Sequence, residues 1–146
     1  MPGFAMDDLQ LLRYSRHLLL NELGPDAQAR FAAAHALVVG TGGLGNPAAQ
    51  FLASAGIGTL TLVDADVVDL TNLQRQIAHT TDRIGMPKVE SARAAIAAIN
   101  PEAEVIAHHE RLTAANALDL VSAYDIVADG SDNFETLDYR LVHEGV

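Results

Sequence analysis

Four short runs rich in apolar and β-branched residues recur along the chain, and longer amphipathic stretches separate them. Runs of this length predict buried strands, and the stretches between them have the length and composition of helices. We expect strands at 36–39, 59–63, 104–107 and 125–128, and helices at 47–55, 89–100, 113–121 and 134–143.

Strand and helix alternate throughout this part of the chain. Such alternation predicts parallel βαβ units with right-handed crossovers. We therefore expect an α/β fold, a Rossmann-like parallel sheet with flanking helices. The sequence ends at Val146, inside or just after a helix, where an alternating fold would continue with another strand. We expect an incomplete sheet and the front part of a larger domain.

The first 35 residues predict a separate helical segment. Residues 9–23 are rich in Leu and Arg and predict one helix, with Asp7 and Asp8 at its start. Gly24-Pro25 would break it, and residues 26–34 predict a short second helix. The expected domains are an N-terminal helical segment, 1–35, and a Rossmann-like nucleotide-binding domain, 36–146.

A glycine-rich stretch, GTGGLG at 40–45, joins the first expected strand to the next helix. The spacing of Gly40, Gly42 and Gly45 is that of a nucleotide-binding fingerprint. Glycines let the backbone approach phosphates, and the helix N-terminus offers unpaired N–H groups. Asp64 ends the second expected strand, where a carboxylate would accept hydrogen bonds from ribose hydroxyls. The alternative is a tight turn in a non-binding domain, with Asp64 capping a loop.

The glycine loop lacks the Lys-Ser/Thr pair of a Walker A sequence, so a cation for a triphosphate must come from elsewhere. Lys88 is the only lysine and stands where a helix is expected to begin; the alternative is a solvated side chain. Arg75 could place its guanidinium on phosphate oxygens. Its alternative is an exposed loop with a weak Asp–Arg pair. We expect Asn46 to cap the helix after the loop, with the following proline at the first helical position.

Asp132 follows the fourth expected strand. Because ligands bind beyond the carboxyl ends of parallel strands, Asp64 and Asp132 are both expected to face the glycine loop. Asp132 could hold Mg²⁺ on a polyphosphate. The alternative is that Asp132 and Asn133 cap the helix expected at 134–143.

Charge and composition exclude several classes of protein. The 146 residues include 9 basic and 19 acidic side chains, a formal net charge of −10, which argues against nucleic-acid and anionic-membrane partners. There is no cysteine, which excludes disulfides, Cys-ligated metals and a Cys nucleophile in this stretch. No apolar run is long enough for a membrane span, and residues 1–8 lack the features of a signal peptide. We expect a cytoplasmic protein.

Seven segments together resemble the MoeB/ThiF/HesA family, relatives of the ubiquitin-activating enzymes. Their order and spacing cover nearly the whole chain, which is far more specific than the glycine loop alone. The segments are RYSRH (13–17), GTGGLG (40–45), LVDAD (62–66), TNLQRQ (71–76), MPKVESA (86–92), INP (99–101) and DGSDN (129–133).

The resemblance implies an adenylyltransferase that transfers AMP from ATP to the C-terminal glycine carboxylate of a ubiquitin-like sulfur carrier protein, in a thiamine or molybdopterin pathway, and releases pyrophosphate. It implies a homodimer in which Arg16 enters the nucleotide site of the other protomer. It also implies catalytic roles for Arg16, Arg75, Lys88 and Asp132, with Asp132 at Mg²⁺. The implied nucleotide-binding residues are Gly40, Gly42, Gly43, Gly45, Asp64, Asn72, Arg75, Lys88, Asp132 and Asn133.

The chain departs from the family pattern because it lacks the later Cys pairs that bind zinc in family members. Two other functions remain open. An NAD-dependent oxidoreductase uses the same glycine fingerprint, but it gives Arg75, Lys88 and Asp132 no reason to converge. A non-catalytic nucleotide-binding fragment would bind ATP without supporting pyrophosphate exchange.

Overall fold

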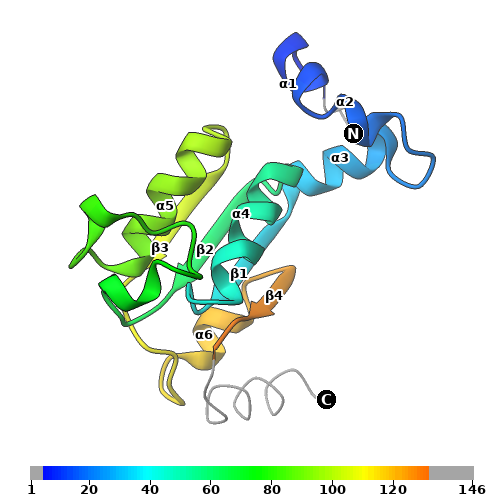
Figure 1. Cartoon of the computed structure of the whole chain (residues 1–146). Coiled ribbons are helices and arrows are strands. Elements are labelled where there is room, and N and C mark those ends of the chain that lie inside the picture. Colours follow the sequence, from blue (N-terminus) through cyan, green and yellow to red (C-terminus); the bar gives the residue numbers. More distant parts are fainter. Residues whose placement is uncertain (1–4, 132–146) are drawn as a thin grey trace.

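The computed structural model describes residues 5–131 (Figure 1). Within them, four strands form one sheet in the order β3-β2-β1-β4, and every neighbouring pair is parallel. The strands are β1 (His35–Val39), β2 (Thr59–Val63), β3 (Glu104–His108) and β4 (Ile126–Asp129). The predicted α/β, Rossmann-like parallel sheet is confirmed, and each strand lies within a residue of its expected bounds.

The strand register brings all four carboxyl ends to one edge of the sheet. Val39 pairs with Val63 on one side and with Asp129 on the other, and Val63 pairs with His108. The residues that follow these positions, including the glycine loop and Asp64, therefore start from one line across the sheet. This alignment places the candidate site.

Helices cover both faces of the sheet. On one face lie α4 (Gly45–Ala55) and α5 (Lys88–Ile99), and on the other lies α6 (Ala117–Val121). Alternate residues of β1 separate into two apolar cores: Ala36 and Val38 belong to the core under α4 and α5, whereas Leu37 and Val39 belong to the core under α6. This alternation is the two-residue period of a strand buried on both faces.

The N-terminal segment folds as α1 (Asp8–Arg13), α2 (Ser15–Leu18) and α3 (Gly24–Ala33). The predicted single helix over 9–23 is wrong. The chain bends at Tyr14, a residue that is 7% exposed and whose hydroxyl accepts a hydrogen bond from Asn100 Nδ2 at 3.0 Å. Gly24 and Pro25 form the first turn of α3, where the fixed φ of proline suits a helix start.

The start of α4 also differs from the expectation. Leu44 occupies the N-cap position, and Asn46 lies inside the first turn, fully buried. Its Oδ1 accepts hydrogen bonds from the Ala78 amide at 3.1 Å and from Gln50 Nε2 at 2.7 Å. Asn46 therefore holds a distant loop against α4 and does not cap the helix.

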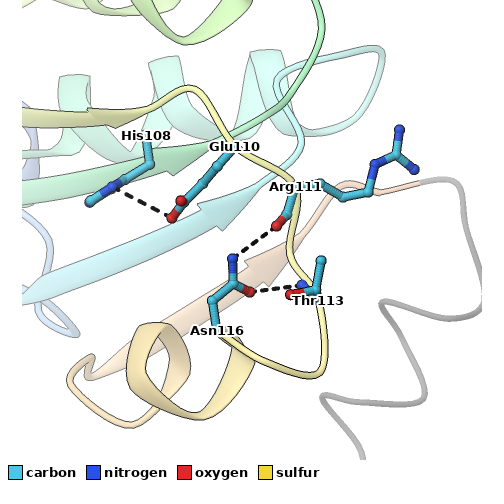
Figure 2. A network of polar contacts seen from close by, with 5 residues as sticks. All are labelled: His108, Glu110, Arg111, Thr113 and Asn116. Atoms are coloured by element: carbon cyan, nitrogen blue, oxygen red, sulfur yellow. Dashed lines mark hydrogen bonds and ion pairs between the residues drawn. The ribbon is translucent and has the colours of Figure 1, made fainter.

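The connection from β3 to β4 has less helix than predicted. The helix expected at 113–121 is confined to α6, because Asn116 closes a turn in front of it: its Oδ1 accepts from the Thr113 amide at 2.7 Å and its Nδ2 donates to the Arg111 carbonyl at 2.9 Å (Figure 2). The connection from β2 to α5 carries two short 3-10 helices, η1 (Leu70–Asn72) and η2 (Thr81–Arg83). The helix expected at 134–143 lies outside the described residues.

Candidate functional site

A cavity of about 550 Å³ opens at the carboxyl ends of the strands. Four segments that are distant in sequence line it: the glycine loop, the connection from β2 to α5, the loop after β3 and the residues after β4. Among the residues predicted for the site, Gly40, Gly42, Gly43, Asp64, Asn72, Arg75 and Lys88 line this cavity.

The glycine loop is built by close backbone packing. Gly40 has a φ of +85°, which favours glycine. A Cβ on Gly45 would lie 1.6 Å from the Gly40 carbonyl oxygen, and a Cβ on Gly130 would lie 2.5 Å from the Gly45 nitrogen. These three glycines let the loop, the start of α4 and the end of β4 touch. The sequence alone predicts no role for Gly130.

Gly43 differs from these packing glycines. No atom outside its immediate neighbours lies within 4 Å of the position of its Cβ, and the residue is exposed at the wall of the cavity. Its missing side chain therefore leaves open space in front of the loop, as close approach of a phosphate would require.

Asp64 fixes the shape of the loop. Its Oδ2 accepts hydrogen bonds from the Thr41 amide at 2.8 Å and the Thr41 hydroxyl at 3.1 Å, and its Oδ1 accepts from the Asp66 amide at 2.7 Å. The carboxylate thus caps the loop, as the alternative interpretation predicted. It also lines the cavity, and a carboxylate oxygen has two lone pairs, so Oδ1 has one more for a hydroxyl. The ribose contact stays a prediction.

Lys88 is a buried cation at the cavity. It is the first residue of α5 and is only 6% exposed, so the solvated alternative is wrong. Its amide donates to the Asp66 carbonyl at 3.0 Å, which holds the start of the helix against the segment that follows β2. Among residues 5–131 the Lys88 ammonium has no hydrogen-bond partner. Lys88 Nζ is not among the buried polar atoms that lack a partner, so the stem is buried while the ammonium reaches the open cavity, where it can meet an anion.

Arg75 approaches the same cavity from the segment after η1. It is exposed, and its Nη1 donates to the Thr71 carbonyl at 3.1 Å and to Gln74 Oε1 at 3.2 Å. The Asp–Arg pair of the alternative interpretation is absent from the described residues. Asn72 anchors the segment, since its Oδ1 accepts from the Asp69 amide at 3.0 Å. The structure therefore brings Arg75 and Lys88, the two cations predicted for a triphosphate, to one cavity.

Asp69, near this segment, has a pKa below the usual 3.8. The main cause is the hydrogen bond from the Thr71 hydroxyl, followed by that from the Thr71 amide, and the positive charge of Lys88 adds a smaller effect. Asp69 is therefore a carboxylate at neutral pH, and its bonds to Thr71 shape the turn that carries Asn72.

Arg16 does not line the cavity of its own chain. It is exposed on α2, next to Tyr14, which contacts Asn100 at the C-terminal end of α5. Lys88 marks the opposite end of that helix, and a helix of 12 residues is about 18 Å long. Two other predicted site residues, Asp132 and Asn133, lie outside the described residues.

His79 is a site residue that the sequence analysis missed. It is 4% exposed, its Nε2 lies 3.1 Å from the Thr41 carbonyl oxygen, and its Nδ1 lies 2.8 Å from Ser91 Oγ. Because a carbonyl can only accept, Nε2 carries the proton and Nδ1 accepts from the Ser91 hydroxyl. Burial lowers the pKa of His79 below 6.5. A neutral imidazole thus joins the glycine loop to α5.

The described residues offer no group of three or more His, Asp or Glu side chains that could hold a metal ion. The predicted Mg²⁺ ligand, Asp132, is outside them. The chain has no cysteine, so the zinc site of family members has no Cys ligands here. Within residues 5–131, no helix has the length and hydropathy that crossing a bilayer requires.

Comparisons with known proteins find one matching family and several similar enzymes. The sequence profile of the ThiF family matches residues 14–141. The chain is 49% identical over 135 residues to the probable adenylyltransferase/sulfurtransferase MoeZ of Mycobacterium tuberculosis, covering 92% of this chain and 34% of that protein. It is 46% identical to the SAMP-activating enzyme E1 of Haloferax volcanii, covering 90% of this chain and 49% of the relative. The chain thus spans between a third and a half of the length of these relatives.

A solved structure shares both the fold and a nucleotide. The crystal structure of the Escherichia coli tRNA N6-threonylcarbamoyladenosine dehydratase TcdA in complex with ATP superimposes with a TM-score of 0.88 at 34% identity. The match covers 97% of this chain and 59% of TcdA. Almost the entire chain is therefore similar to a structure that holds ATP.

Proposed function

The chain belongs to the ThiF family, and from that premise we propose that it forms the ATP-binding part of an adenylyltransferase. The convergence of the glycine loop, Arg75 and Lys88 on one cavity carries this proposal. A glycine loop alone would suit NAD equally well. Two cations from a different connection, one of them buried, suit the extra negative charge of a triphosphate.

We propose that the acceptor is the C-terminal glycine carboxylate of a ubiquitin-like sulfur carrier protein. Its oxygen would attack the α-phosphorus of ATP, a new P–O bond would form, and the bond to the β-phosphate would break to release pyrophosphate. The carboxylate is already ionised at neutral pH, so the reaction needs no general base. The name of the relative MoeZ, an adenylyltransferase/sulfurtransferase, supports the adenylyl transfer. The choice of a sulfur carrier rests on the family resemblance.

The chemical difficulty is charge, because two anions must approach each other on a chain with a net charge of −10. The neutralisation must therefore be local. The ammonium of Lys88 would meet the phosphates from the buried side, and the guanidinium of Arg75 from the exposed side. The amides at the start of α4 would add their partial positive charge. When bound, Mg²⁺ would neutralise further phosphate charge, with Asp132 as its proposed ligand.

The proposal is tested by titrating the chain with ATP in the presence of Mg²⁺. Lys88→Met keeps most of the side-chain volume and removes the charge, and Arg75→Ala removes the guanidinium. A hydrogen bond to a charged group contributes about 1.5–3 kcal/mol, so each variant should bind ATP roughly ten- to hundredfold more weakly. Circular dichroism checks that each variant is folded, and Arg30→Ala, an exposed arginine on α3, is the matched control.

Thermal unfolding separates this proposal from an NAD-dependent oxidoreductase. A ligand that binds only the folded chain stabilises it, by about 2.7 kcal/mol at a hundredfold excess over its dissociation constant. We expect ATP with Mg²⁺ to raise the melting temperature and NAD to leave it unchanged. Protection by NAD alone would contradict the proposal. ATP–pyrophosphate exchange that both Lys88→Met and Arg75→Ala retained would contradict the roles assigned to these residues.

A further inference from the structure

The loop after β3 contributes a second group of residues to the cavity. Glu110, Arg111 and Leu112 line it together with the glycine loop. The phosphate-binding residues proposed above all come from other segments, and none of the sequence motifs includes Arg111. This leaves a third cavity arginine or lysine, in addition to Arg75 and Lys88, whose role is unassigned.

The backbone that carries Arg111 is firmly held. Its carbonyl accepts from Asn116 Nδ2 at 2.9 Å, and the same Asn116 side chain binds the Thr113 amide at 2.7 Å (Figure 2). The next residue, Leu112, is 5% exposed and packs in the core under α6 with Val39 and Val63. The side chain of Arg111 therefore starts from a fixed point at the edge of the cavity.

The guanidinium itself is not used by the described part of the protein. Arg111 is exposed, and among residues 5–131 its side chain forms no hydrogen bond or ion pair. The carboxylate next to it in sequence, Glu110, lies 3.8 Å from His108 Nδ1 and makes no ion pair with Arg111. Figure 2 shows the Arg111 side chain extending away from this network of polar contacts. A planar cation is thus available to a ligand.

The cavity has two chemically different sides. Lys88 belongs to the helix that covers one face of the sheet, and Arg75 to the connection that leads into it. On the other side, next to Arg111, the lining residues are Val39, Val63 and Leu112. They belong to the core under α6 and are 4%, 1% and 5% exposed, so only their edges reach the cavity. Phosphates require the side with the two cations. A purine ring requires the apolar side, where it can bury its flat surface.

We propose that the guanidinium of Arg111 stacks on the purine ring of bound ATP and holds it against this apolar wall. The inference rests on the proposed function and assigns the nucleoside end of the same site. Arginine suits this role because its planar, delocalised cation stacks on aromatic faces, whereas the ammonium of lysine is a strongly hydrated point charge. Arg111 is then a base-binding residue, and its contribution does not depend on the number of phosphates.

The test compares three ligands with the intact chain: ATP, AMP and inorganic tripolyphosphate. Dissociation constants are measured by calorimetry for the wild type, Arg111→Ala and Arg111→Lys, with Arg30→Ala as a control for the loss of one positive charge. A cation–π contact contributes on the order of 1–2 kcal/mol. Arg111→Ala should therefore raise the dissociation constants of ATP and AMP by the same factor, about five- to thirtyfold. Tripolyphosphate should bind to Arg111→Ala as tightly as to the wild type. Arg111→Lys should recover only part of the lost affinity for ATP and AMP.

The alternatives give different results. If Arg111→Ala lowers the affinity for ATP and tripolyphosphate but leaves the affinity for AMP unchanged, Arg111 contacts phosphates and the inference is overturned. If it weakens none of the three while the wild type binds ATP, Arg111 does not touch the nucleotide, and the proposed function stands without it. If the wild type binds no ATP, the proposed function fails, and the inference fails with it.

Discussion

At the scale of single residues, His79 shows how a buried polar group can organise a site without touching a ligand. Its two ring nitrogens bind the Thr41 carbonyl and the Ser91 hydroxyl, so it joins the glycine loop to α5. Thr41 in turn is bound by Asp64. The loop is thus held from two sides, and only the neutral imidazole can accept from Ser91 while donating to Thr41.

This arrangement predicts a pH dependence of stability. The pKa of His79 in the folded chain lies below 6.5, mainly because of burial, and the charges of Lys88 and Arg83 lower it while the Thr41 bond and the Asp64 charge raise it. As the pH falls through about 6.5, the unfolded chain takes up a proton that the folded chain does not bind. The free energy of unfolding should therefore fall, by at most about 1.4 kcal/mol per pH unit for one proton.

The measurement is urea unfolding at pH 7.5 and pH 5.5 for the wild type and His79→Gln. The variant should be less stable than the wild type at pH 7.5, because glutamine cannot reproduce both hydrogen bonds of the imidazole. The difference in the free energy of unfolding should narrow at pH 5.5, because only the wild type has the imidazole that takes up a proton on unfolding. Arg30→Gln retains His79 and should follow the wild type at both pH values. The carboxylates of Asp69 and Asp82, whose pKa values hydrogen bonds hold below 3.8, do not titrate in this window. An equal difference in the free energy of unfolding between the wild type and His79→Gln at both pH values would contradict the prediction.

Sequence reasoning at this scale found groups whose chemistry is visible in the residue type. It identified Asp64, Arg75 and Lys88 because a carboxylate after a strand and cations outside a glycine loop suit a nucleotide, and the structure places all three at one cavity. It missed His79 and Arg111, because nothing in the sequence distinguishes them from the other histidines and arginines. The roles of both residues depend on their neighbours in the folded chain. His79 is buried between Thr41 and Ser91, and Arg111 lies at the cavity next to its apolar lining residues.

At the scale of elements, the junction of β1, α4 and β4 depends on glycines of two kinds. Gly45 has no room for a side chain, since its Cβ would meet the Gly40 carbonyl at 1.6 Å, whereas Gly43 has no atom within 4 Å of the same position. The first kind allows the packing of the fold, and the second keeps the cavity open. The two kinds are alike in sequence and can be separated by substitution.

Gly45→Ala should destabilise the chain by about 3 kcal/mol, because a methyl group is forced against backbone that cannot move aside. Gly43→Ala should change stability by less than about 0.5 kcal/mol, since its φ is not in the left-handed region and the space is empty. Gly43→Ala should nevertheless bind ATP more weakly, because the methyl group occupies the space in front of the glycine loop that phosphates would enter. Urea unfolding and ATP titration of both variants check the two effects separately. Equal stability of the two variants would contradict this distinction.

The contrast between local sequence signals and contacts with distant residues explains which elements the sequence predicts well. The four strands were found within a residue, because an apolar run buried on both faces leaves its signal in the sequence itself. Helix starts were less predictable. Asn46 has the residue type of an N-cap, but it lies inside α4 and binds the Ala78 amide, a contact with a segment 32 residues away. The bend at Tyr14 likewise depends on Asn100, 86 residues away.

At the scale of the whole molecule, the N-terminal helices leave an apolar surface exposed. Leu9, Leu12, Leu19 and Leu20 on and after α1 and α2 are 60%, 72%, 77% and 50% exposed. Figure 1 shows these helices set apart from the sheet, beyond α3. Exposed leucines are typical of a site of association where they gather in one patch. This surface fits the homodimer implied by the family resemblance, which the single chain leaves as a proposal.

A homodimer would also explain Arg16. Within one chain this residue does not line the cavity. It lies on α2, next to Tyr14, which contacts the C-terminal end of α5, whereas Lys88 at the cavity marks the opposite end of that helix. In a two-fold symmetric dimer, a residue that leaves its own protomer can enter the site of the other, and the exchange occurs twice. Each complete site would then combine Arg75 of one protomer with Arg16 of its partner.

This arrangement predicts complementation between two defective variants. Arg16→Ala and Arg75→Ala should each bind ATP weakly as homodimers, because both sites lack one guanidinium. After equal mixing and subunit exchange, half of the dimers are mixed, and each mixed dimer holds one site with both arginines and one with neither. About a quarter of the wild-type number of tight ATP sites should therefore reappear in a titration. If Arg16 instead acted within its own chain, every site in a mixed dimer would still lack one arginine, and mixing would restore no tight binding.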